Sequence, residues 1–446
     1  MSLTGGTVTN AYGGGNNAGV TTTNVTLNGS TCTKVFGGSN ASGTVTTSNV
    51  TCTSGSATSV YGGNNQGGTT ATTNVTVNGG TITNAYGGGE KTDVTTKTNV
   101  TINSTASYVY GGSNTSGTVT ETNVRLNGSA TDVYGGNNLG GTSTTTLVTV
   151  AGNATNVYGG GNQAATTTST INYNSGTVTN VYGGGNKAGV TTTNVNLGAG
   201  SITNVFGGSN TSGNVTTSNV STVTSASNLT VSNVFGGNNQ GGTTTTSHVT
   251  LSRGTINNVY GGGERAGTNA TNVAINGATI NQMVYGGGDN AQVTTDTNVS
   301  ITNNSRVIGN VFGGGNNGAV LGNTVVTTNS ATIDSNVYGG GNQADVSGTT
   351  DVTITNNSLI KGNVFGGGNV GEVDDETTVE INGSTVKQSV YGGGNQADTG
   401  DATNVTIKNS ATVEQNVYGG GNAGEVDGIT TVEINNATVT KCLWWR

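Results

Sequence analysis

Residues Gly176 to Gly200 read GTVTNVYGGGNKAGVTTTNVNLGAG. This segment contains two stretches rich in Thr and Val, separated by Gly-rich corners. Val178 stands between two threonines, and Val195 and Leu197 flank Asn196. Such alternation places apolar side chains on one face of a strand and polar ones on the other. β-Branched residues favour strands, whereas abundant Gly and the lack of a 3.6-residue apolar period exclude a helix. The segment therefore predicts two short β-strands.

Close variants of this segment are repeated along the chain. The most regular feature is an aromatic residue followed by Gly-Gly, with spacings of 24 or 25 residues up to Phe206 and 25 to 29 residues afterwards. The frame contains all five Phe and twelve of the fourteen Tyr of the protein. The framed aromatics are Tyr12, Phe36, Tyr61, Tyr86, Tyr110, Tyr134, Tyr158, Tyr182, Phe206, Phe235, Tyr260, Tyr285, Phe312, Tyr338, Phe365, Tyr391 and Tyr418.

One repeat is too short to bury its own apolar face, so the repeats are expected to stack. Stacked coils pair every backbone group and lie ~4.8 Å apart. The sequence predicts an all-β fold, a single-chain parallel β-solenoid of about 17 coils with 24–29 residues each. We expect one continuous solenoid over residues 1–441, with neutral Thr/Asn-rich coils in 1–250, longer and more acidic coils in 251–441, and a tail at 442–446.

Glycine and proline usage agrees with stacked strands. The chain has 80 Gly and no Pro. Proline would remove a ladder donor in nearly every coil. The glycines after each aromatic are expected to let the chain turn with a positive φ.

Composition excludes several classes of protein. Only 30% of residues are hydrophobic and 8% are charged, and the net charge is −8. The 13 Lys and Arg form no basic stripe, which argues against nucleic-acid binding. No apolar run is long enough for a membrane span, and the N-terminus does not resemble a signal peptide. Both ends cut into the repeat without polar caps, so we expect a fragment of a longer protein.

The few unusual residues within strands test the predicted faces. Lys97, Glu121 and Arg125 replace Thr at positions predicted to face outward. Val100 and Ile102, at inward positions, stay apolar. This agreement is expected of a correct register.

Two cysteines, Cys32 and Cys52, fall at inward positions of neighbouring half-coils. Free Cys is readily buried, so two small core residues are expected. A disulfide is the alternative in an extracytoplasmic setting.

An Asn recurs directly before the inward Val of the second strand. Stacked amides are expected to form hydrogen-bonded ladders, and sugar binding by this row is the functional alternative. Leu147 and His248 occupy the same position in other coils. The row consists of Asn24, Asn49, Asn74, Asn99, Asn123, Asn194, Asn219, Asn272 and Asn298.

Acidic residues are concentrated late in the chain. Only four of the 21 precede residue 251. Alignment on the aromatics places Asp345, Glu372, Asp398 and Glu425 in one column, seven residues after the aromatic. Neighbouring oxygens would come from Asp374, Asp375, Asp401 and Asp427. Either these carboxylates extend into water, or they bind Ca²⁺, which takes oxygen ligands. Calcium is the one cofactor that the sequence suggests, and the four aligned residues are its candidate ligands.

No motif predicts catalysis. His248 has no nucleophile partner, and the recurring GGGN corner lacks the helix and GK[ST] of a phosphate-binding loop. Tyr and Phe exchange freely in the frame, so the hydroxyl group is dispensable there. A polysaccharide-active β-helix enzyme remains an alternative, but the late carboxylates lack Arg or Lys companions.

The first strand carries a Thr-x-Thr pattern or a close variant in many coils. Examples are Thr7/Thr9, Thr31/Thr33, Ser56/Thr58, Thr81/Thr83, Thr177/Thr179 and Ser201/Thr203. These residues are expected to face outward in two parallel rows, an arrangement that resembles ice-binding proteins. Lys387 and Glu414 interrupt the rows in later coils. An ice- or surface-binding solenoid is therefore an alternative function.

The VYGGGN and TNVTING arrays resemble repeat regions of large bacterial surface proteins of the haemagglutinin and autotransporter-passenger type. The resemblance covers residues 5 to 441. It implies a right-handed β-helix and a non-enzymatic structural or adhesive rod, either secreted or on the cell surface. A phage tail-fibre segment is a variant of this function. The implied partners are an extracellular surface, a glycan or a host ligand. No catalytic residues are implied.

Overall fold

The computed structural model describes residues 1–224 and 228–443. These residues form an all-β parallel β-solenoid of about 18 turns, and no helix occurs among them. The predicted fold class is confirmed. The chain divides into two compact units. The N-terminal unit contains Met1–Thr203 and Gly207–Thr216, and the C-terminal unit contains Asn204–Phe206 and the described part of Thr217–Arg446. That one solenoid continues unbroken over residues 1–441 stays a prediction.

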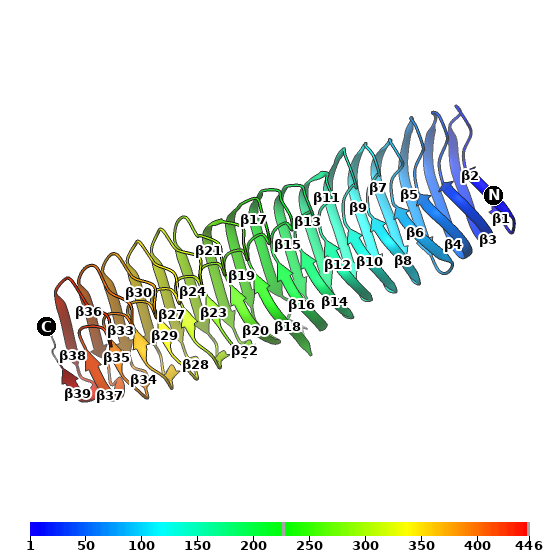
Figure 1. Cartoon of the computed structure of the whole chain (residues 1–446). Coiled ribbons are helices and arrows are strands. Elements are labelled where there is room, and N and C mark those ends of the chain that lie inside the picture. The colour runs from blue at the N-terminus through cyan, green and yellow to red at the C-terminus, as the bar shows by residue number, and fades with distance from the viewer. Residues whose placement is uncertain (225–227, 444–446) are drawn as a thin grey trace. The chain divides into compact units, whose positions relative to one another are not determined.

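Strands of the N-terminal unit follow one another coil by coil (Figure 1). They are β1 (Ser2–Leu3), β2 (Thr7–Tyr12), β3 (Val20–Phe36), β4 (Thr44–Tyr61), β5 (Thr69–Val77), β6 (Thr81–Tyr86), β7 (Asp93–Ile102), β8 (Thr105–Tyr110), β9 (Thr118–Leu126), β10 (Ser129–Tyr134), β11 (Thr142–Val150), β12 (Asn153–Tyr158), β13 (Ala165–Tyr173), β14 (Thr177–Tyr182) and β15 (Val190–Leu197). Two further strands, β16 (Gly200–Phe206) and β17 (Val215–Thr222), contain residues of both units.

Strands of the C-terminal unit become shorter toward its end. They are β18 (Leu229–Phe235), β19 (Thr244–Leu251), β20 (Thr255–Tyr260), β21 (Thr268–Asn276), β22 (Thr279–Ile280), β23 (Val284–Tyr285), β24 (Thr297–Thr302), β25 (Arg306–Val307), β26 (Val311–Phe312), β27 (Thr324–Asn329), β28 (Thr332–Ile333), β29 (Val337–Tyr338), β30 (Thr350–Thr355), β31 (Leu359–Ile360), β32 (Val364–Phe365), β33 (Thr377–Asn382), β34 (Thr385–Val386), β35 (Val390–Tyr391), β36 (Thr403–Lys408), β37 (Thr412–Tyr418), β38 (Thr430–Asn435) and β39 (Thr438–Leu443).

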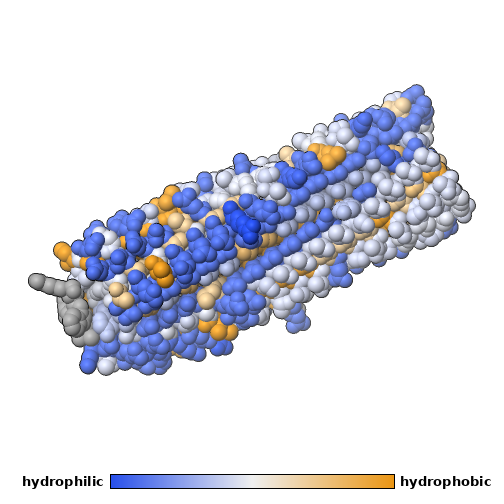
Figure 2. All heavy atoms as spheres, in the orientation of Figure 1, coloured by the Kyte–Doolittle hydropathy of each residue, from blue (hydrophilic) through white to orange (hydrophobic). Residues whose placement is uncertain are grey.

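Like residues stack on like in each unit. Strands β12 and β14 pair in parallel, with Val157 opposite Val181 and Tyr158 opposite Tyr182. The pairing continues through the corner, where the Gly159 N–H donates to the Tyr182 carbonyl at 2.9 Å. The inward side chains of each coil therefore bury those of the next. The same stacking produces surface stripes of similar hydropathy that run from coil to coil (Figure 2).

The framed aromatics form one ring stack in each unit. Centroids of successive rings lie 4.5 to 5.1 Å apart in the N-terminal unit, from Tyr12 to Tyr182. In the C-terminal unit, from Phe206 to Tyr418, they lie 4.7 to 5.0 Å apart. Close, nearly parallel rings are favourable contacts beyond the area they bury. Within each unit, the predicted aromatic column is confirmed.

The glycines after the aromatics have a different role from the predicted one. Among the described residues, none of the glycines directly after a framed aromatic has a positive φ, so that expectation was wrong. They are needed because successive coils approach closely. A Cβ at Gly111 would lie 2.0 Å from the Gly135 carbonyl oxygen. Positive φ occurs instead at other corners, for example at Gly29 and Gly176.

A second, three-coil period is superposed on the coil repeat. The third residue after the aromatic follows the order Gly15, Ser39, Asn64 and then Gly89, Ser113, Asn137. The Ser39 N–H donates to Asn64 Oδ1 at 2.8 Å, and the Ser113 N–H donates to Asn137 Oδ1 at 2.9 Å. All four side chains are fully buried. A shift of one coil would leave these buried amides unpaired, so the triplet specifies which coil neighbours which.

The predicted strand faces are confirmed in the N-terminal unit. Lys97, Glu121 and Arg125 are exposed. Val100 and Ile102 are buried in the core. The charged side chains of β7 and β9 therefore lie at outward-facing positions of these strands.

In most coils of the C-terminal unit, the first strand is split into two short strands. Residues 281–283, for example, form a bend between β22 and β23. A column of Val293, Val320, Val346 and Val373 lies in the core of these coils.

Ionisation of the aromatic column should limit stability at high pH. Burial, with the nearby Glu90 and Asp289 charges, raises the pKa of Tyr86 and Tyr285 to about 12. An unfolded Tyr ionises near pH ~10, so the stabilisation is fully present below that pH and is lost as the pH rises toward about 12. We expect cooperative loss of the β circular-dichroism signal in that window, together with the appearance of tyrosinate absorbance.

Replacing one buried hydroxyl group provides the control for this titration. Tyr134→Phe, at a position only 5% exposed, should shift the alkaline midpoint to higher pH. Tyrosinate absorbance that develops well before the β signal is lost would show that the column is open to solvent.

Candidate functional site

The four candidate calcium ligands form the aligned column that the sequence predicts. The Val346 N–H donates to the Glu372 carbonyl, and the Thr399 N–H donates to the Glu425 carbonyl, both at 2.9 Å. Asp345, Glu372, Asp398 and Glu425 therefore lie on successive coils. All four are exposed. The column is a corner of the C-terminal unit open to solvent.

Half of these carboxylates already have a structural partner. Asp345 Oδ1 accepts the Glu372 N–H at 2.9 Å, and Asp398 Oδ1 accepts the Glu425 N–H at 2.7 Å. The accompanying Asp374, Asp375, Asp401 and Asp427 are also exposed. Within residues 1–224 and 228–443, no three His, Cys, Asp or Glu side chains are grouped closely enough to hold a metal ion. Calcium binding stays a prediction.

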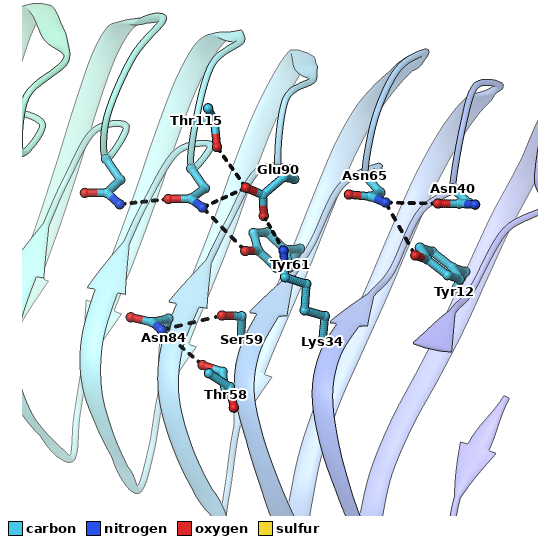
Figure 3. Close-up of polar contacts among 12 residues, drawn as sticks. Tyr12, Lys34, Asn40, Thr58, Ser59, Tyr61, Asn65, Asn84, Glu90 and Thr115 are labelled. Atoms are coloured by element: carbon cyan, nitrogen blue, oxygen red, sulfur yellow. Dashed lines mark hydrogen bonds and ion pairs between the residues drawn. The ribbon is translucent and has the colours of Figure 1, made fainter. Parts of the chain in front are cut away.

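A polar centre that the sequence did not single out surrounds Glu90 (Figure 3). Glu90 replaces the Asn of the GGGN corner and is only 9% exposed. Its carboxylate accepts hydrogen bonds from Asn114 at 3.0 Å and Thr115 at 2.8 Å. Lys34 Nζ lies 3.3 Å from Glu90 Oε2 and 5.9 Å from the Tyr61 ring centroid. The motif change from GGGN to GGGE is the signal that could have revealed this centre.

The Glu90 centre is electrostatically satisfied. Burial acts to raise the pKa of Glu90, but hydrogen bonds from Tyr61 and Thr115 and the Lys34 charge outweigh it and lower the pKa. Glu90 in turn adds to burial in raising the pKa of Tyr61. Glycoside hydrolysis usually needs a pair of carboxylates about 5 to 9.5 Å apart, one of them held protonated. A single ionised carboxylate paired with Lys does not provide that chemistry, so we interpret this centre as structural.

The predicted Asn row is a hydrogen-bonded ladder in the first coils. Asn49 Nδ2 donates to Asn24 Oδ1 at 2.9 Å, Asn74 to Asn49 at 2.8 Å, and Asn99 to Asn74 at 2.9 Å. Leu147 lies opposite Asn123 in the same row, as expected. These amides are used in coil-to-coil bonds, which supports the structural interpretation of the row.

A second Asn ladder runs along the corner, four residues after each aromatic. In the N-terminal unit, Asn40 donates to Asn16. Further along the unit, the ladder runs from Asn210 through Asn186, Asn162, Asn138 and Asn114 to Glu90. In the C-terminal unit it runs from Asn422 through Asn395, Asn369, Asn342 and Asn316 to Asp289. In each bond the later coil donates. The recurring Asn is visible in the sequence, but the sequence does not show which coil donates each hydrogen bond.

Both cysteines at inward positions are core residues. Cys32 and Cys52 are free and buried. Burial, with Cys32 nearby, raises the pKa of Cys52 to about 12. Such thiols are almost fully protonated at neutral pH and unreactive. The expectation of two small core residues is confirmed, and the disulfide alternative is not observed.

The Thr-x-Thr pattern forms two registered rows on the N-terminal unit, which we call the hydroxyl face. The first row is Thr7, Thr31, Ser56, Thr81, Thr105, Ser129, Asn153, Thr177 and Ser201. The second row is Thr9, Thr33, Thr58, Thr83, Ser107, Thr131, Thr155, Thr179 and Thr203. Figure 2 shows near-neutral rows of this kind along the unit. The outward orientation that the sequence predicts is confirmed, since no member of either row is buried.

One pocket of the N-terminal unit was considered as a candidate site. A pocket of about 330 Å³ in the N-terminal unit is lined by Thr142, Ser143, Ala165, Thr166, Thr167, Gly189, Val190, Thr191, Asn214 and Thr216. None of these side chains is an acid, a base or a thiol. His248 lies in the Asn row, opposite Asn272.

Comparisons with known proteins identify no relative. No protein-family model, curated protein or solved structure matches the chain. Among the described residues, no helix has the length and apolar character needed to cross a bilayer.

The calcium hypothesis makes a specific prediction for the acidic column. Millimolar CaCl₂ should raise the melting temperature more than NaCl at the same ionic strength, because monovalent salt only screens the repulsion. Asp398→Asn should remove most of this additional increase. The variant retains an oxygen that can accept the Glu425 N–H and loses only the charge.

Asp351→Asn is the matched control, because Asp351 lies on β30 of the same unit, outside the column. It should leave the calcium effect unchanged. Identical calorimetric melts with calcium and with chelator, at matched ionic strength, would establish a solvated corner.

Proposed function

We propose that the chain is a non-enzymatic structural and adhesive solenoid, secreted or displayed on a bacterial surface. One observation carries this proposal. In each unit, the most restricted residues of the coil stack on their own equivalents in the next coil and do not converge on a site. Rings stack on rings, as with Tyr134 and Tyr158 at 4.5 Å, and amides stack on amides, as with Asn162 and Asn138 at 2.9 Å.

Stacked repeats of this kind supply extended surface rather than a pocket. The buried polar groups of the Glu90 centre and the Asn ladders are already paired, so they favour stability. The low charge content and the outward Thr and Asn provide a polar surface for contact with an extracellular surface, a glycan or a host ligand. The resemblance to bacterial surface repeats supports the same location.

Binding without turnover is the test of this function. The purified chain should be retained on some members of an immobilised polysaccharide and glycan panel and release no reducing ends from them. It should also stay intact during prolonged protease treatment, because paired strands expose little extended chain. Heat-unfolded chain on the same panel controls for non-specific capture.

Two results would contradict the proposal. One is the release of reducing ends in proportion to protein concentration and its loss in Glu90→Gln. The other is rapid proteolysis together with no retention on any surface of the panel.

A further inference from the structure

We propose that the hydroxyl face of the N-terminal unit binds the ordered water lattice of ice. This inference is independent of the adhesive role, which does not require ice. It is based on the chemistry, the spacing and the rigidity of the two rows defined above.

The chemistry of the face is uniform. Seventeen of its eighteen positions carry a hydroxyl group, and the remaining one is Asn153. Eight of the nine residues in the second row are Thr, and the ninth is Ser107. No charged, aromatic or large aliphatic side chain interrupts either row. A Thr side chain offers a hydroxyl group that donates and accepts, next to a methyl group.

The hydroxyls of the second row are available to solvent. Eight of the nine residues are exposed, and Ser107 is half-buried. None of these side chains hydrogen-bonds another residue in the described part of the chain. First-row hydroxyls are partly used within the row, since Ser56 Oγ donates to Thr31 Oγ1 at 3.3 Å and Thr105 Oγ1 lies 3.0 Å from Ser129 Oγ. The second row therefore has the greater capacity to order water.

The spacing of the face is regular in two directions. Parallel register places row members one coil apart, ~4.8 Å, and strand geometry separates the two rows by ~6.7 Å. Small or β-branched inward residues between the rows, such as Ala106 and Ile202, are buried. Each strand of the array after β2 pairs with the strands of both neighbouring coils, so the array is rigid. A fixed two-dimensional array of this kind is a better match for a crystal surface than for a flexible ligand.

Other occupants fit the face less well. Nucleic acid would require Lys and Arg, which both rows lack. Protein interfaces are usually centred on aromatic, Met or Arg side chains, and these are also absent. A protein surface that binds glycans usually offers aromatic side chains on which the sugar rings stack. The uncharged hydroxyl face has none, so it favours water itself.

The C-terminal unit shows what the same positions contain when no such face is maintained. Its coils carry Arg306 in the first row and Asp334, Lys361, Lys387 and Glu414 in the second. These side chains form ion pairs, including Arg306 with Asp334 and Lys361 with Asp334 at 2.8 Å. Charged substitutions are thus compatible with the coil, and their absence from nine successive coils is specific to the N-terminal unit.

Ice adsorption by the full chain tests the proposal. The fluorescently labelled protein should coat a growing ice surface, and the unlabelled protein should inhibit ice recrystallisation. The double variant Thr131→Lys/Thr155→Lys, with two bulky charges in the middle of the second row, should need at least about tenfold more protein for the same inhibition. Both variant positions are exposed, and Lys occurs at equivalent positions in the C-terminal unit, so the fold should persist.

Thr145→Lys is the matched control. Thr145 is exposed on another strand, in a column that already contains Lys97 and Glu121. It should keep wild-type activity, and the melting temperatures of all three proteins should agree. Failure of the wild-type chain to adsorb to ice, or equal inhibition by the double variant and the wild type, would overturn the proposal. If the double variant melts early, Thr131→Val, which keeps the shape and removes one hydroxyl group, replaces it in the comparison and should reduce inhibition.

Discussion

Parallel backbone pairing between successive coils is the constraint on which the rest of the structure depends. It fixes the coil spacing at ~4.8 Å and places equivalent residues directly above one another. Every side chain must therefore tolerate contact with its own kind. Aromatic rings, amides, hydroxyls and small aliphatic groups meet this condition in the core, whereas like charges stack only at exposed positions such as the acidic column. The low content of charged residues and the absence of Pro follow from this single constraint.

Direction along the ladders is a second consequence. In the two Asn ladders described above, the amide of a later coil donates to the preceding one, so the amide dipoles are aligned with their positive ends toward the N-terminal side. A carboxylate can accept but cannot donate, and it is favoured at the positive end of aligned dipoles. Glu90, Asp132 and Asp289 accept from Asn114, Asn156 and Asn316 in this way. These three acidic residues are thus the acceptors at the N-terminal ends of Asn ladders.

Much of the fold could be predicted because the repeat makes the pattern visible many times. The strand faces, the aromatic column and the alignment of Asp345 with Glu372 follow from period and parity alone. The role of the glycines after the aromatics could not be predicted, because close approach between coils is a property of the stack and not of one segment. The Glu90 centre was missed for a related reason: Lys34 and Glu90 are 56 residues apart and meet only through stacking across coils. Whether the acidic column holds a cation depends on side-chain positions that the sequence does not specify.

The close approach of successive coils can be tested with two glycines of the C-terminal unit. A Cβ at Gly286 would lie 2.1 Å from the Gly313 carbonyl oxygen, whereas one at Gly267 would meet only the Gln292 carbonyl at 3.7 Å. Chemical denaturation of Gly286→Ala should show a loss of about 3 kcal/mol or more, the upper end of the usual cost of overpacking. Gly267→Ala should stay within ~0.5 kcal/mol of the wild type. Equal stability of the two variants would contradict the account, because it would mean that the coils are not held at the spacing that backbone pairing requires.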